Sequence, residues 1–297
     1  MTELAQFGSG GEENHQSWRQ LYFQARRALG RDFEARLMVQ QLAGKWGAEF
    51  WVSADQAAPP DALGLLGQMI ERRLSHEPLA YVLGSWSFLG IEVAVGPGVI
   101  VPRPETEVTA WCAIERLRGM AGSRRLEIAD LGTGSGAIAL GLARFGGPVR
   151  VWAVELYDEA ASWANRNLKS HPELASLIEL RRGSWYEALP EELRGGLDLV
   201  VSNPPYVAAS EVETLEPEVA VWEPREASVA GESGLEASLE VLGGAREWLR
   251  EGGEVVLEVS ADRAEETAEA ARRAGLAVVE TRVDLAGRPR VLVARRD

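Results

Sequence analysis

The chain has 297 residues, of which 46% are hydrophobic and 26% are charged, a composition typical of folded globular proteins and not of disordered chains. Acidic side chains outnumber basic ones by 45 to 31, and the net charge of −14 argues against binding to a nucleic-acid backbone. The single cysteine, Cys112, and three scattered histidines argue against an internal disulfide and against a cysteine- or histidine-rich metal site. The polar N-terminus does not resemble a signal peptide, and no apolar stretch reaches the roughly 18 residues of a membrane span, so we expect a cytoplasmic protein.

The N-terminal part of the sequence predicts a short tail followed by helices. Residues 1–16 are rich in Gly, Glu and Asn, which favours a flexible tail. Over residues 17–77 the apolar residues recur at helical spacing, as Leu21 and Ala25 do, and Asp61 is placed to cap a third helix at its N-terminus. We therefore expect a small helical bundle over residues 17–77.

The remainder of the chain predicts a β-hairpin and then an α/β domain. In residues 78–104, aromatic and β-branched residues punctuated by glycines predict a hairpin that links two domains. Residues 105–297 alternate short apolar runs with helical stretches, which predicts a mostly parallel sheet with helices on both faces. Because no helix fits between the last two runs, we expect them to form a terminal antiparallel hairpin. The seven expected strands are 126–130, 149–155, 177–183, 197–203, 253–259, 276–283 and 290–296.

A glycine-rich loop closes the first expected strand of the sheet. Glycines at this point let the backbone turn tightly and let a ligand approach closely, and ligands bind at such crevices in open α/β sheets. Glu155 ends the next strand, where its carboxylate can accept both hydroxyl groups of a ribose. These features predict that a nucleoside binds to Glu155 and to the five loop residues, Gly132, Thr133, Gly134, Ser135 and Gly136.

The spacing of the glycines favours S-adenosyl-L-methionine over NAD as this ligand. The loop reads G-x-G-x-G and not the G-x-G-x-x-G of dinucleotide-binding proteins, and Asp130 lies two positions before its first glycine. A carboxylate so close would repel a pyrophosphate, whereas it can bind the methionine ammonium group or fix the loop through backbone amides. We therefore expect S-adenosyl-L-methionine as the cofactor, and no metal ion.

The segment Asn203-Pro204-Pro205-Tyr206, which follows the fourth strand, is the strongest chemical signal in the sequence. Its two prolines make a stiff turn, so the side-chain carbonyl of Asn203 and the backbone carbonyl of Pro204 form a rigid pair of acceptors. Such a pair suits a planar NH₂ group, against which the Tyr206 ring can pack. Because an amide nitrogen is a poor nucleophile, two acceptors would orient it towards a methyl donor and disperse the charge that develops. We predict Asn203 and Pro204 as catalytic groups and 203–206 as the substrate-binding segment.

Six segments together resemble the protein-(glutamine-N(5)) methyltransferases of the HemK/PrmC type, which modify peptide chain release factors. They are EPLAYVLGSWSFLG (77–90), VPRPETE (101–107), ADLGTGSGAIAL (129–140), VSNPPY (201–206), EPREASVAGESGLE (223–236) and AGRPRVL (286–292). The resemblance implies a Rossmann-like class I methyltransferase domain over 105–297 and an N-terminal bundle that helps to recognise the protein substrate. It implies that the methyl acceptor is the glutamine of the Gly-Gly-Gln motif in class I release factors, whose modification aids translation termination.

The resemblance also assigns residues around the cofactor. It implies that Trp185 flanks the adenine and that Asn203 contacts the cofactor as well as the substrate. The sequence departs from the family pattern at Ser184, where an Asp usually precedes this tryptophan.

Several other functions are compatible with part of these signals. Adenine-amine DNA methyltransferases share the Asn-Pro-Pro-Tyr segment, but they must flip a base out of the duplex and generally carry a basic region that this acidic chain does not obviously provide. The same charge argues, less strongly, against a guanine-modifying ribosomal RNA methyltransferase. A ribosomal-protein glutamine methyltransferase would use identical chemistry, whereas the intact acceptor turn argues against a non-catalytic cofactor-binding scaffold. We favour a monomeric release-factor methyltransferase without a nucleic-acid or membrane partner.

Overall fold

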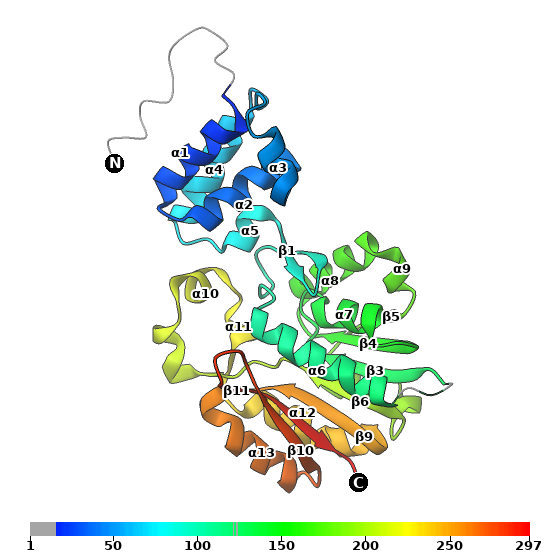
Figure 1. Cartoon of the computed structure of the whole chain (residues 1–297). Coiled ribbons are helices and arrows are strands. Elements are labelled where there is room, and N and C mark those ends of the chain that lie inside the picture. The colour runs from blue at the N-terminus through cyan, green and yellow to red at the C-terminus, as the bar shows by residue number, and fades with distance from the viewer. Residues whose placement is uncertain (1–15, 121, 123) are drawn as a thin grey trace. The chain divides into compact units, whose positions relative to one another are not determined.

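The computed structural model describes residues 16–120, 122 and 124–297, so the predicted tail at 1–16 lies outside the described residues except for Gln16 (Figure 1). The chain divides into two compact units, the first ending at Leu83 and the second spanning Gly84–Asp297. Among the helices of the described residues, none is long and apolar enough to cross a membrane.

The first unit is helical, as the sequence predicts. Its helices are α1 (Trp18–Leu29), α2 (Asp32–Ala43), α3 (Gly47–Ser53), α4 (Ala62–Leu74) and α5 (Leu79–Leu83). Helix α1 begins with a capping box in which Ser17 and Gln20 each accept a hydrogen bond from the other's backbone N–H. Asp61 precedes α4 as predicted, although its side chain makes no capping hydrogen bond.

The β-hairpin is shorter than the predicted segment 78–104. It consists of β1 (Ser85–Phe88) and β2 (Ile91–Ala94), whereas residues 79–83 form α5 within the first unit. Arg72 explains part of this difference, because its guanidinium donates hydrogen bonds to the backbone carbonyls of the last turn of α5, at 3.0 and 3.4 Å. A basic side chain upstream thus supports a helix in a segment whose aromatic and β-branched residues favour a strand.

The second unit contains a seven-stranded sheet in the order β5–β4–β3–β6–β9–β11–β10 (Figure 1). Strand β11 is antiparallel to both β9 and β10, while β5, β4, β3, β6 and β9 pair in parallel. The predicted strands and the terminal antiparallel hairpin are therefore confirmed. The strands are β3 (Leu126–Leu131), β4 (Val149–Glu155), β5 (Ile178–Arg182), β6 (Leu197–Ser202), β9 (Leu249–Glu258), β10 (Ala277–Val283) and β11 (Pro289–Arg295).

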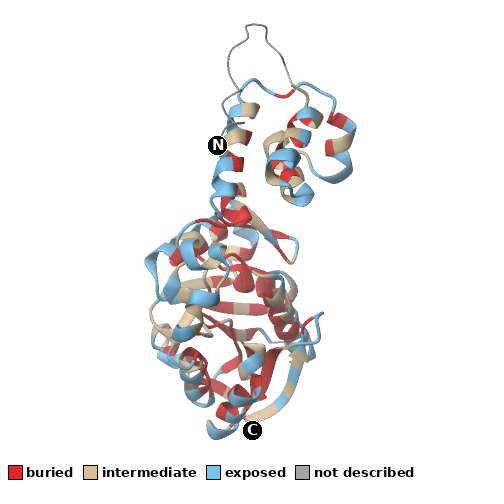
Figure 2. Cartoon of the chain, turned by 90° about the vertical axis from the view of Figure 1, so that its left-hand side faces the viewer, coloured by how far each residue is buried: buried red, intermediate tan, exposed pale blue. Residues whose placement is uncertain are grey.

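Helices cover both faces of this sheet, which makes its central strands the core of the unit (Figures 1 and 2). Successive residues of β3 are buried on opposite faces, and Leu131 belongs to the cluster that includes Val241 and Ala268 from α12 (Glu236–Trp248) and α13 (Ala264–Arg273). The other face packs against α6 (Pro104–Met120) and α7 (Ala137–Phe145), which contact each other. The remaining elements are α8 (Asp158–Ser170), α9 (Pro172–Ala175), α10 (Pro217–Trp222), α11 (Arg225–Ser228), β7 (Val207–Ala208) and β8 (Val229–Gly231).

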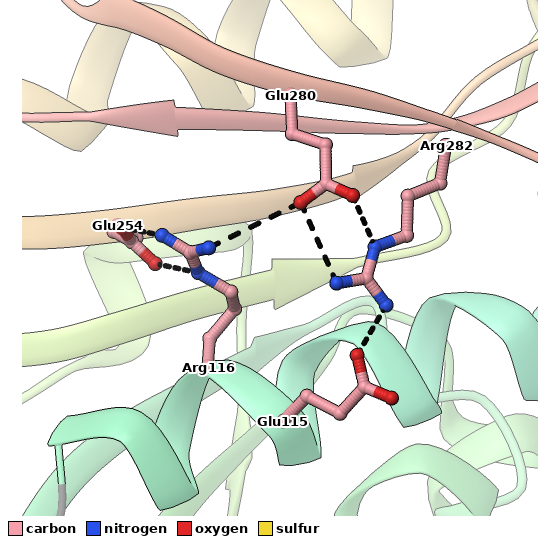
Figure 3. A network of polar contacts seen from close by, with 5 residues as sticks. All are labelled: Glu115, Arg116, Glu254, Glu280 and Arg282. Carbon is pink, nitrogen blue, oxygen red and sulfur yellow. Dashed lines mark hydrogen bonds and ion pairs between the residues drawn. The ribbon is translucent and has the colours of Figure 1, made fainter.

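Helix α6 is attached to the sheet by a network of ion pairs (Figure 3). Arg116 donates to Glu254 on β9 at 2.6 Å and lies 4.0 Å from Glu280 on β10. Arg282 pairs with Glu280 at 2.6 Å and with Glu115 on α6 at 2.5 Å. Because the two arginines connect the helix to two strands, the network fixes α6 over this part of the sheet.

Candidate active site

The loops that follow the parallel strands line one cavity of about 180 Å³ in the second unit. Open α/β sheets bind their ligands at this edge, so the cavity lies where the sequence predicts a site. Most of the lining is apolar. It comes from the loops after β3 (132–135) and β5 (183–185), from the end of β4 and the loop after it (154–157), and from Asn203 and Pro205 after β6. The other lining residues are 98–102, Thr106, Ala137, Ile138, Ala160, Pro224, Glu226 and Ala227.

The glycine loop and Glu155 form a single hydrogen-bonded unit. Gly132 and Thr133 both donate their backbone N–H to the Val154 carbonyl at 2.9 Å, which ties the loop to β4. Gly134 donates its N–H to one carboxylate oxygen of Glu155, and Tyr157 donates to the other, both at 2.9 Å. Each oxygen retains acceptor capacity, since a carboxylate offers about four lone-pair sites. The Glu155 carboxylate can therefore accept two further hydrogen bonds, which fits the two hydroxyl groups of a ribose.

Left-handed backbone geometry explains why this loop needs glycine. Gly132, Gly134 and Gly136 have φ values of 74°, 57° and 82°, which side chains with a Cβ rarely adopt. A Cβ at Gly132 would lie 3.4 Å from the ring of Trp185, an ordinary contact distance, so the backbone conformation and not a clash calls for glycine. The loop thus brings its backbone close to an aromatic wall.

Asp130 stabilises the glycine loop from the protein interior, away from the cavity. Its side chain is fully buried, does not line the cavity, and accepts a hydrogen bond from the Thr133 hydroxyl at 2.6 Å. Burial raises the pKa of Asp130 to about 7, and the Thr133 hydrogen bond opposes this rise. Of the two roles that the sequence allows for this carboxyl group, the structure therefore supports fixing the loop.

Trp185 forms an aromatic wall of the cavity. It starts a short 3-10 helix, Trp185–Ala188, with a φ of 40°, an uncommon value for a residue that is not glycine. Its indole N–H donates to the carboxylate of Glu240 on α12, which holds the ring. A flat ring beside a glycine backbone suits a planar base such as adenine, and Ser184 lines the cavity next to it.

Asn203 is fixed by a residue that lies far away in the sequence. Its amide nitrogen, Nδ2, donates a hydrogen bond to the Thr106 hydroxyl at 3.1 Å, and both residues line the cavity. Because Nδ2 is the donor in this contact, the carbonyl oxygen Oδ1 is the acceptor that the amide offers elsewhere. The rigid Asn-Pro-Pro turn then continues into β7, which pairs with β8.

Most of the predicted site residues meet at this cavity, but three of them do not line it. Gly136 lies at the start of α7 and donates its N–H to the Thr133 carbonyl at 2.9 Å. Pro204 is buried, and its predicted contribution is a backbone carbonyl. Tyr206 is partly buried, and burial raises the pKa of its hydroxyl to about 12. The residues that do line it are Gly132, Thr133, Gly134, Ser135, Glu155, Trp185, Asn203 and Pro205.

Sequence reasoning did not single out two polar contacts that shape the site. Glu223 accepts hydrogen bonds from Arg103, at 2.7 Å to both of its carboxylate oxygens, and from the N–H of Val101 at 3.2 Å. These contacts connect residues 98–102 to the cavity-lining residues that follow Glu223 in the sequence. Thr106 holds Asn203. Thr106 lies in VPRPETE and Glu223 lies in EPREASVAGESGLE, two of the segments that carry the family resemblance. That resemblance was the sequence signal from which the two residues could have been found.

Comparisons with known proteins show the family to which the chain belongs. Family models for a PrmC N-terminal domain and for a methyltransferase small domain match residues 18–84 and 115–219. A release factor glutamine methyltransferase from Bordetella pertussis is 38% identical over 260 residues, which are 87% of this chain and 92% of that protein. The chain belongs to the release factor glutamine methyltransferase family. A Geobacter sulfurreducens protein of the same name is 32% identical over 94% of both chains.

Membership of this family makes the protein an S-adenosylmethionine-dependent methyltransferase, and it confirms the HemK/PrmC resemblance. A solved methyltransferase from Pyrococcus furiosus shares the fold, with a TM-score of 0.51 and 19% identity over 77% of this chain and 98% of that one. The glycine backbone, the Glu155 carboxylate and the Trp185 ring fit S-adenosyl-L-methionine. Over the described residues, no group of three or more His, Cys, Asp or Glu side chains could hold a metal ion.

Proposed function

We propose that the protein transfers a methyl group to the side-chain amide nitrogen of the glutamine in the Gly-Gly-Gln motif of class I peptide chain release factors, which aids translation termination. The observation that carries this proposal is that Asn203, held by Thr106, lines the same cavity as the Glu155 carboxylate and the glycine loop. In this proposal the Asn203 carbonyl accepts from the planar amide, and the part of the cavity around Glu155 binds the nucleoside. The names of the family relatives support a release-factor glutamine as the substrate.

The proposed mechanism uses orientation and electrostatics, without a strong base. When bound, S-adenosyl-L-methionine supplies a methyl group activated by a positively charged sulfur. The Asn203 Oδ1 and the Pro204 carbonyl accept the two N–H groups of the substrate amide, which points the nitrogen at the methyl group and stabilises the positive charge that develops on it. Tyr206 and Pro205 hold the flat amide in place, and the methylated nitrogen loses its proton to water.

The cofactor is held by the other half of the cavity. Glu155 accepts the ribose hydroxyls, the backbone of residues 132–136 follows the methionine part, and Trp185 flanks the adenine. Asn203 contacts the cofactor at the boundary between the two halves. This assignment is supported by the lining of the cavity and by the two backbone N–H groups that orient the Glu155 carboxylate.

The helical unit recognises the release factor in this proposal, and the protein acts as a cytoplasmic monomer without a nucleic-acid partner. The match of a PrmC N-terminal domain to residues 18–84 supports the first point. The net charge of −14 supports the last, because a negative surface repels phosphates.

The experiment incubates the protein with methyl-labelled S-adenosylmethionine and, separately, a class I release factor, ribosomal proteins and duplex DNA. We expect label on the release factor, and none on a release-factor variant in which the glutamine of Gly-Gly-Gln is replaced by alanine. Label on ribosomal proteins or DNA alone would contradict the proposal.

A further inference from the structure

Part of the cavity wall belongs to a long loop, residues 209–228, which connects β7 to β8 and contains α10 and α11 (Figure 1). Because β7 and β8 pair with each other, the loop begins and ends close to the same place. Three of its residues, Pro224, Glu226 and Ala227, line the cavity. The 209–228 loop is therefore closed at its base and carries one part of the cavity wall.

The 209–228 loop is attached by charged side chains and not by an apolar core. Among residues 209–228, all of which the structure describes, Glu223 alone is buried, and its side chain is 1% exposed. Near the base of the loop, Glu211 pairs with Arg263 at 2.6 Å. Segments with few buried apolar contacts open at a low cost in free energy. The loop is therefore suited to open while the rest of the unit stays folded.

A second part of the wall, residues 98–102, is fixed by packing. Val99 and Val101 are buried. The indole N–H of Trp163 on α8 donates a hydrogen bond to the Pro97 carbonyl at 3.0 Å, which holds the beginning of this segment against the helix. The cavity is thus lined by one firmly packed segment and by one loop without a buried apolar side chain.

Glu223 connects the 209–228 loop to the firmly packed segment. It accepts hydrogen bonds from the Arg103 guanidinium, at 2.7 Å to both oxygens, and from the Val101 N–H at 3.2 Å. Burial raises the pKa of Glu223, and the charge of Arg103 opposes this rise. A buried carboxylate that loses its partner is costly. Because the rest of the loop is not buried, Glu223 would avoid this cost by moving into water, and the cavity-lining residues that follow it would move with it.

We propose that the 209–228 loop is a lid over the cofactor, and that the Arg103–Glu223 ion pair closes it. In the closed state the pair holds the residues after Glu223 against the cavity, which retains the bound cofactor. When the pair breaks, the loop turns about its base and the cofactor exchanges with the solvent. Neither Arg103 nor Glu223 lines the cavity, so the pair acts on the cofactor through the loop. The inference rests on the proposed function, because it takes this cavity as the S-adenosyl-L-methionine site.

The first experiment measures how fast methyl-labelled S-adenosylmethionine leaves the protein during a chase with unlabelled cofactor. We expect dissociation to be at least about tenfold faster in Arg103→Met and about fivefold faster in Glu223→Gln, because each removes hydrogen bonds to a charged group. Arg103→Lys keeps the charge and should stay within about threefold of wild type. Because both residues act in one contact, the double variant Arg103→Met/Glu223→Gln should release the cofactor no faster than the faster single variant.

The second experiment measures hydrogen exchange by mass spectrometry, which reports opening of the loop without turnover. No residue of 209–222 lines the cavity, so slower exchange there on addition of S-adenosylmethionine reports closure of the loop and not direct contact with the cofactor. We expect this slowing in the wild type. In cofactor-free Arg103→Met the same amides should exchange at least about fivefold faster, while those of β3 are unchanged.

Glu34→Gln is the control for the loss of a paired carboxylate elsewhere in the chain. Glu34 pairs with Arg73 at 2.7 Å in the helical unit, and its side chain is 13% exposed. Cofactor dissociation should be the same in this variant as in the wild type. If Arg103→Met does not fold, the exchange of the wild type with and without cofactor decides.

Three outcomes would overturn the inference: unchanged dissociation in Arg103→Met, an equal acceleration in Glu34→Gln, or exchange of 209–222 that the cofactor does not slow. Absence of release-factor methylation by the wild-type enzyme is a different failure. It contradicts the proposed function, whereas dissociation and exchange are measured with the cofactor alone.

Discussion

The hydrogen bonds that stabilise the two halves of the cavity join residues at very different separations in the sequence. In the glycine-loop half, Thr133 bonds to Asp130 three positions away, and Gly134 bonds to Glu155 over 21 positions. In the Asn203 half, the amide bonds to Thr106 over 97 positions, and Glu258 bonds to Thr109 over 149. The glycine-loop half is therefore a local motif, whereas the Asn203 half depends on how α6 docks on the sheet. Substitutions in the two halves should accordingly change different kinetic constants.

The largest effect is expected from Asn203→Ala, which removes an acceptor from the Asn203 half. We expect kcat to fall by about tenfold to a hundredfold, the scale of one lost transition-state hydrogen bond, while the Kd of S-adenosylmethionine changes much less. Steady-state kinetics and calorimetry measure the two. Asn165→Ala, at an exposed position on α8, is the matched control. Unaltered turnover would remove Asn203 from the mechanism.

The second prediction concerns the glycine-loop half of the cavity, where we expect a substitution to change the Kd of S-adenosylmethionine more than kcat. Glu155→Ala should weaken S-adenosylmethionine binding by about tenfold or more, because hydrogen bonds to a charged group contribute about 1.5–3 kcal/mol. The kcat at saturating cofactor should fall far less. Calorimetry with Glu179→Ala, a partly exposed glutamate on β5, gives the comparison. Equal affinity in the two variants would show that Glu155 does not hold the cofactor.

A smaller effect is expected in the pH dependence of stability. Burial raises the pKa of Glu258 from 4.5 to about 7, so the folded state retains this proton more strongly than the unfolded state does. Ionisation of the buried carboxyl group therefore adds no cost below about pH 4.5, where both states hold the proton, and becomes increasingly destabilising as the pH rises from there to about 7. Glu258→Gln removes this cost, so its Tm relative to wild type should rise by a few degrees between pH 5 and pH 8.

The measurement is a thermal melt of both proteins at each pH. Asp130, whose pKa is also about 7, is present in both proteins, so its contribution cancels. A Tm difference that stays constant with pH would show that Glu258 titrates normally.

Much of the fold could be predicted because its signals are local. The seven strands appear as short apolar runs, and the glycine loop and Glu155 lie at the ends of neighbouring strands. Helix α5 escaped prediction because its residues favour a strand and its last carbonyls are satisfied by Arg72. Helix α3, with seven residues, is too short for helical periodicity to show.

The parts of the site that sequence reasoning missed depend on tertiary contacts. Thr106 reaches Asn203, and Thr109 reaches Glu258, only because α6 docks on the sheet. Glu223 likewise shapes the site through its ion pair with Arg103, which lies 120 positions away in the sequence. Such pairs cannot be read from spacing along the chain.

In the proposed mechanism, two carbonyl oxygens hold the substrate amide beside the methyl donor. A crystal structure with S-adenosylhomocysteine and a Gly-Gly-Gln peptide tests it most directly. We expect the glutamine side-chain nitrogen to lie within hydrogen-bonding distance of Asn203 Oδ1 and the Pro204 carbonyl, facing the cofactor sulfur. A glutamine amide bound elsewhere, with Asn203 turned away from it, would rule out this mechanism.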